Sequence, residues 1–175
     1  MHNPYYEMTV PLFIKSLTQV DHLLKTAEKF VLEQGMQESD ILEARLAPDM
    51  FPFVKQVQIT CDNAKGSSAR LAGIEAPVMM DDEASIPELR ARVAKTLAFL
   101  ESLTAEQFTD AADRKVELPY FKDKHFKGND FLTHHALPNF YFHFVTIYGI
   151  LRMKGMQIGK ADYAGMLPLQ DNILA

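Results

Sequence analysis

Residues 129–152 read NDFLTHHALPNFYFHFVTIYGILR, which is the most aromatic stretch of the chain and contains three of its six histidines. The length and apolar content of this stretch predict a long core helix. On such a helix His135, Asn139 and His143 recur every four residues and therefore line one face. A polar line on an apolar helix indicates either a hydrogen-bonded buried network or a binding site. The sequence leaves both interpretations open.

Three further segments repeat apolar residues with the 3.6-residue period of an amphipathic helix. They cover residues 4–34, 52–72 and 85–102. Gly35 and Gly73 are expected to end the first two of these helices. Pro11 is expected to kink the first helix or to start it afresh, because proline lacks a backbone N–H. Ser85 and Glu88 form the capping box that predicts the start of the third helix.

The remaining segments predict shorter elements around these four helices. Residues 104–110 repeat the capping pattern of a short helix, and residues 114–127 predict a small hairpin or an extended loop. The last long helix is expected to end at Gly155 and to be kinked by Pro138. An irregular tail follows at residues 156–175. The sequence therefore predicts a single all-α domain over residues 1–175, with a small extended excursion before the last long helix.

The composition is that of a globular domain, with 47% hydrophobic and 23% charged residues. A length of 175 residues suits one domain with its own core. The formal net charge is −5 and no basic stripe is present, which argues against nucleic acid and anionic membranes as partners. The longest apolar run, residues 140–151, is shorter than the ~20 residues that a membrane-spanning helix needs.

Cys61 is the single cysteine, so an intrachain disulfide cannot form. Together with the absence of a secretory signal at the start of this sequence, this predicts a cytoplasmic protein. We expect Cys61 to be a small core residue, as free cysteines often are. Arg90, Arg92, Lys95 and Glu101 are expected to face water on the third helix. No nucleophile, base and acid occur in a recognisable catalytic pattern.

Five short motifs occur in order along nearly the whole chain. They are FPFVKQVQITCD at 51–62, LAG at 71–73, LPNFYFH at 137–143, LR at 151–152 and GK at 159–160. In this order and spacing they resemble an uncharacterised bacterial family of the DinB/YfiT-like superfamily. The resemblance implies an up-down-down-up four-helix bundle that is often a homodimer.

The resemblance also implies a metal site that this sequence matches only in part. Many superfamily members hold a divalent metal with one histidine from the second helix and two histidines four apart on the last long helix. Here His143 matches one of that pair, Asn139 stands in place of the other, and His135 matches no ligand. The second helix offers only Gln58 or Asp62. Such a set suits zinc poorly and a harder ion such as Mn²⁺ better.

Two functional hypotheses follow. The first is a small-molecule-binding or stress-related accessory bundle with a degraded metal site, dimerising through the aromatic helix faces. The second is a divalent-metal-dependent hydrolase or thiol transferase, with the metal on His143 and help from Asn139 and from Asp62 or Gln58. Each residue also has a purely structural interpretation. His143 needs only one or two hydrogen bonds in a core, Asn139 could bond backbone freed by Pro138, and Gln58 and Asp62 could face water.

Overall fold

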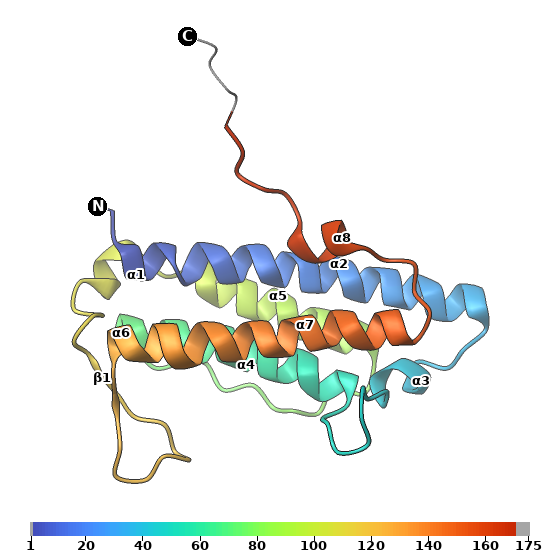
Figure 1. The fold of residues 1–175 in the computed structure, drawn as a ribbon, viewed down its shortest axis with the longest axis horizontal. Coiled ribbons are helices and arrows are strands. Elements are labelled where there is room, and N and C mark those ends of the chain that lie inside the picture. Colours follow the sequence, from blue (N-terminus) through green and yellow to red (C-terminus); the bar gives the residue numbers. More distant parts are fainter. Residues whose placement is uncertain (1, 171–175) are drawn as a thin grey trace.

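Four long helices lie side by side and enclose the core in the computed structural model, which describes residues 2–170 (Figure 1). They are α2 (Val10–Gln34), α4 (Phe53–Ala72), α5 (Ile86–Glu101) and α7 (Leu137–Met153). Figure 1 shows α4 and α5 running in the same direction, opposite to α2 and α7. Over residues 2–170 the chain is mostly helical, as the sequence predicts, and the excursion at residues 114–127, for which the sequence predicts a hairpin or an extended loop, includes a small two-stranded hairpin.

Proline and glycine set the boundaries of the first two long helices. The chain forms α1 (Pro4–Glu7) and then starts α2 afresh, with Pro11 in its first turn, where a missing N–H costs no hydrogen bond. Gly35 and Gly73 end α2 and α4 with φ of +63° and +73°, a left-handed conformation that glycine adopts readily. Between these helices lies the short α3 (Ser39–Leu42).

The cap of α5 differs slightly from the predicted capping box. Ser85 Oγ accepts the N–H of Glu88 at 3.3 Å, as predicted. The Glu88 carboxylate accepts the N–H of Ala84 at 2.6 Å, one residue before the cap. A short 3₁₀ helix, η1 (Ala105–Phe108), follows α5 with Thr104 and Gln107 as its capping box.

The excursion before the last helix is a two-stranded antiparallel hairpin. Strand β1 (Lys115–Val116) pairs with β2 (Phe126–Lys127). The chain then returns to the bundle at Gly128, where a Cβ atom would lie 1.7 Å from the carbonyl oxygen of Ala111. Only glycine fits this close approach, so the sequence fixes where the hairpin joins the bundle.

The last long helix passes Pro138 without leaving the helical conformation. The chain forms α6 (Gly128–Phe131), a π-helical turn η2 (Leu132–Ala136) and then α7. A π turn is wider than an α turn and accommodates the missing N–H and the bulk of the proline ring. The expected disturbance at Pro138 therefore takes the form of a wide turn directly before it.

The first part of the segment after α7 packs against the bundle. Met156 and Ile158 are buried, and α8 (Lys160–Ala164) packs against α2. His22 Nε2 and Asp162 Oδ1 lie 2.9 Å apart across this contact. The prediction of an irregular tail from residue 156 is therefore wrong for residues 156–164, because the buried Met156 and Ile158 and the helix α8 pack against the bundle. Residues 171–175 of that tail lie outside the described residues.

The core draws apolar side chains from all four long helices. Fully buried examples are Leu17 and Leu24 on α2, Val57 and Leu71 on α4, Leu89 and Val93 on α5, and Ile147 and Ile150 on α7. The helix α4 is enclosed by α7 on one side and by α5 on another, so even its polar Gln56, Thr60 and Lys65 are buried. Among residues 2–170, no helix combines the length and apolarity needed to cross a bilayer.

Candidate functional site

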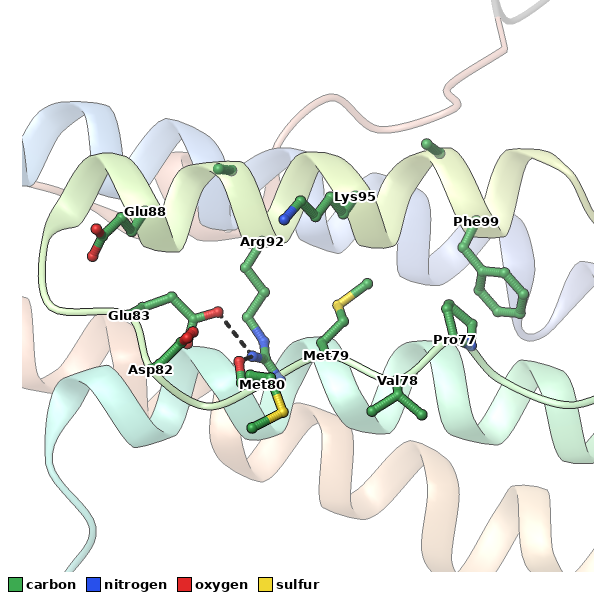
Figure 2. Close-up of a pocket in the computed structure, with 12 residues that line it drawn as sticks. Pro77, Val78, Met79, Met80, Asp82, Glu83, Glu88, Arg92, Lys95 and Phe99 are labelled. Carbon is green, nitrogen blue, oxygen red and sulfur yellow. Dashed lines mark hydrogen bonds and ion pairs between the residues drawn. The ribbon is translucent and has the colours of Figure 1, made fainter.

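A groove lies between α5 and the segment that joins α4 to α5. We call residues 73–85 the crossover segment, and Figure 2 shows it passing between α5 and α4. The groove has a volume of about 890 Å³. Its lining comes from both sides: Pro77, Val78, Met79, Met80, Asp82 and Glu83 on the crossover segment, and Glu88, Ala91, Arg92, Lys95, Ala98 and Phe99 on α5.

Arg92 extends from α5 to the crossover segment and binds it. Its side chain is only 1% exposed, although it carries a charge. One terminal nitrogen, Nη1, donates to the carbonyl of Met80 and to Glu83 Oε1, both at 2.9 Å. The other, Nη2, donates to Asp62 Oδ1 at 2.7 Å and pairs with Asp81 Oδ1 at 2.9 Å. Of the three guanidinium nitrogens of Arg92, Nε is the one without a hydrogen-bond acceptor among the described residues.

The charges around Arg92 balance. Lys55 pairs with Asp81, and Lys65 Nζ lies 2.9 Å from Asp62 Oδ1. Burial raises the pKa of Asp81, but hydrogen bonds and charges from Lys55 and Arg92 outweigh it, and the pKa falls below its usual range. Burial likewise opposes the charge of Arg92, and its carboxylate partners raise its pKa in spite of that. Three cations thus neutralise three carboxylates.

Burial of Arg92 contradicts the prediction that this residue faces water. The helix face that carries it would be open if the crossover segment did not cover it. Burying a guanidinium is costly unless its N–H groups find acceptors. The acidic run Asp81–Glu83 supplies two of these acceptors. In the sequence, this run was the signal that could have indicated a buried partner for Arg92.

His143 lies at the contact between α7 and α4 and is 7% exposed. Its Nδ1 lies 2.7 Å from Gln56 Oε1. The amide nitrogen of Gln56 donates to the carbonyl of Phe51 at 3.1 Å, which turns Oε1 toward the imidazole. Because an amide oxygen only accepts, His143 Nδ1 must donate, and the neutral ring keeps its lone pair on Nε2. Burial lowers the pKa of His143, so the ring is neutral near pH 7.

Gln58 and Asp62 lie on another face of α4 and belong to the Arg92 network. Gln58 Nε2 donates to Glu83 Oε2 at 2.9 Å, and Asp62 binds Arg92. Gln56 and Gln58 are two residues apart, so they point about 200° apart around the helix. The helix thus directs Gln56 toward His143 on α7, and Gln58 with Asp62 toward the crossover segment. Sequence reasoning missed Gln56, although it follows Phe53 by three residues on the buried face.

His135 and Asn139 belong neither to the His143–Gln56 pair nor to the Arg92 network. His135 Nε2 lies 2.7 Å from the hydroxyl of Tyr120, and its ring stacks on Phe131 at 5.4 Å between centroids. Burial and the nearby Arg70 lower the pKa of His135. Asn139 is partly buried on α7. In residues 2–170, no hydrogen bond joins either side chain to His143, Gln58 or Asp62.

Cys61 is a core residue, as predicted. It is fully buried, and this burial raises the pKa of its thiol to about 12. A thiol with such a pKa is protonated near neutral pH and is a poor nucleophile.

The residues present do not fit the metal site that the superfamily resemblance implies. Within the described part of the chain, no three His, Cys, Asp or Glu side chains are grouped so as to hold an ion. The carboxylates of Asp62, Asp81 and Glu83 instead converge on Arg92. His143 is bound to an amide rather than placed beside a second histidine.

The family model described as Domain of unknown function (DUF1993) matches residues 5–164. The chain belongs to this family. A crystal structure described as a DinB family member from Shewanella denitrificans is 39% identical, with 95% of each chain covered and a TM-score of 0.91. The resemblance to a DinB-like domain of unknown function is thereby confirmed. No curated protein matches the chain.

We expect Arg92→Met to lower the free energy of unfolding of this DUF1993 protein by roughly 3 kcal/mol, because three carboxylates lose their shared cation. This value is at the lower end for a broken buried pair, since Asp62 and Asp81 still reach water. Urea denaturation followed by circular dichroism measures the change. The matched control is Arg90→Met, whose partly exposed pairs with Asp21 and Glu28 should contribute no more than about 1 kcal/mol. Equal losses in the two variants would contradict a special role for Arg92.

Proposed function

We propose that this DinB-like protein binds a small amphipathic molecule in the groove between the crossover segment and α5. The observation that carries the proposal is the groove itself, whose volume of about 890 Å³ lies within the range typical of small-molecule sites. Methionines 79 and 80 on one wall have flexible, polarisable side chains that adapt to varied apolar ligands. Charged side chains at the same groove would orient the ligand.

Binding is better supported than catalysis at this groove. A hydrolytic or transfer site needs a group that can accept a proton or attack the substrate. Among the residues that line the groove, Arg92 and Glu83 are already paired with each other, and no histidine or cysteine is present. The buried Cys61 thiol nearby is held protonated. The free titratable groups of the lining are Asp82, Glu88 and Lys95, and the lining includes no hydroxyl, thiol or imidazole group that could act as a nucleophile, which favours recognition over covalent chemistry.

The bundle order and the assembly belong to the same proposal. The directions of the four long helices support the up-down-down-up order that the family resemblance implies. An exposed apolar face on α7 supports a homodimer. This face carries three exposed apolar side chains at helical spacing, Phe142, Val145 and Met153. Leu46, from the segment between α3 and α4, lies beside Gly149 on the same face of α7. A free buried thiol agrees with a cytoplasmic setting.

A second candidate function, a metal-dependent hydrolase or thiol transferase, is favoured by one observation. Gln56 holds the neutral ring of His143 with its lone pair on Nε2, the orientation in which metal-binding histidines are often fixed. Asn139 is one turn away on α7. We derive no reaction step from this arrangement, because a catalytic ion needs about three protein ligands.

Binding to the groove can be measured with N-phenyl-1-naphthylamine, a neutral probe that fluoresces in apolar surroundings. We expect saturable binding at one site per chain. Ala98→Trp should abolish it by filling the groove, whereas Ala94→Trp, on the same helix but outside the groove lining, should not. Absence of saturable binding, or equal binding by both variants, would argue against the groove as the ligand site.

Metal content separates the two candidate functions. The protein is incubated with Zn²⁺, Mn²⁺ or Ni²⁺, desalted and analysed by mass spectrometry, with His143→Ala as control. The binding proposal predicts well below one ion per chain in both proteins. About one ion per chain in the wild type, lost in His143→Ala, would instead support the metalloenzyme.

Light scattering tests the homodimer. We expect a mass of about twice the 19.8 kDa of one chain, and a shift toward the monomer in Val145→Glu, because a buried unpaired carboxylate opposes association. Val78→Glu, on the exposed crossover segment, should leave the mass unchanged. A monomeric wild-type protein would refute the dimer.

A further inference from the structure

The groove has a polar end and an apolar end. Figure 2 shows Glu88, Glu83 and Asp82 together at one end, and Phe99 with Pro77 and Val78 at the other. Glu88 and Phe99 belong to the same helix and are about 16 Å apart along it. Ala91 and Ala98 are small, which leaves the α5 wall open between the two ends. The groove therefore suits an elongated molecule with unlike ends.

The polar end carries two carboxylates without a cationic side-chain partner, although Glu88 also accepts the Ala84 N–H in the cap of α5. In the described part of the chain, Asp82 and Glu88 form no ion pair with a lysine, arginine or histidine, whereas Glu83 pairs with Arg92. The Arg92 guanidinium adds no attraction for an anion, because three carboxylates already neutralise it. The cation left over in the lining is Lys95, which is exposed on a flexible stem.

Building on the proposed function, we infer that the ligand of the groove is an amphipathic amine. Its protonated amino group lies at Asp82 and Glu88, and its apolar body extends along Met79 to Phe99 and Pro77. The chemistry supports this choice over a carboxylate or phosphate ligand. Two unpaired carboxylates face one unpaired lysine, and the formal net charge of the chain is −5. Lys95 can turn toward water, which costs an exposed lysine little.

Displacement of N-phenyl-1-naphthylamine by octylamine, octanol and octanoate tests the inference, because the three share one apolar chain and differ in head-group charge. We expect octylamine to bind about fivefold more tightly than octanol, and octanoate more weakly than either. High salt should reduce the preference for the amine, since exposed charges are screened.

Charge variants locate the amino group. Asp82→Asn combined with Glu88→Gln should remove the preference for octylamine and leave octanol unchanged, because the amide oxygen introduced by the second substitution would still accept the Ala84 N–H. Lys95→Gln should tighten octylamine. The control Glu75→Gln alters an exposed carboxylate of the crossover segment outside the groove lining, so it should change nothing.

The outcomes distinguish the identity of the ligand as an amine from ligand binding in the groove. Equal displacement by octylamine and octanol, or tightest binding by octanoate, would overturn the amine while leaving the groove as a binding site. A preference for octylamine that persists in the Asp82→Asn, Glu88→Gln variant would also overturn it. Failure of the probe to bind the wild-type protein would overturn the groove function itself.

Discussion

The burial of Arg92 is the constraint on which the candidate site depends. Because α4 and α5 run in the same direction, the chain must travel back along the bundle between them. A segment without regular structure has few backbone hydrogen bonds of its own to fix its path. Arg92, on α5, fixes this path by binding the Met80 carbonyl, Asp81 and Glu83. One wall of the groove consists of this segment, so the contacts of Arg92 position that wall.

We infer that this network contributes more to the path of the crossover segment than to the free energy of unfolding. The attraction between buried charges is largely offset by the loss of hydration, so an apolar replacement of a whole network can be as stable. Here the balanced charges and the fork of the guanidinium determine which residues of the crossover segment lie inward. As a consequence, Glu83 pairs with Arg92, whereas its neighbour Asp82 forms no ion pair among the described residues. This division gives the groove its charge.

At the contact between α4 and α7 a buried histidine is held by an amide, and residues 2–170 contain no grouped set of metal ligands. His143 keeps a defined tautomer because Phe51 orients Gln56, and Gln56 orients the ring. A buried imidazole requires such a partner, since an unpaired one would cost about 1–3 kcal/mol. The amide therefore satisfies the histidine as a structural residue. It also leaves the lone pair of His143 on Nε2.

Local sequence determined the four long helices, where the first two of them end and the burial of Cys61, because 3.6-residue periodicity, Pro11, Gly35 and Gly73 act within a few residues. It left a hairpin or an extended loop open at residues 114–127. The family was also evident from short motifs. The partners of polar side chains were decided only by the tertiary structure. Periodicity places Arg92 at the edge of the apolar face of α5, but an aperiodic segment covers it, and no helical pattern encodes that cover. Likewise, the face of α4 that meets His143 depends on how two helices pack, which selected Gln56 over Gln58.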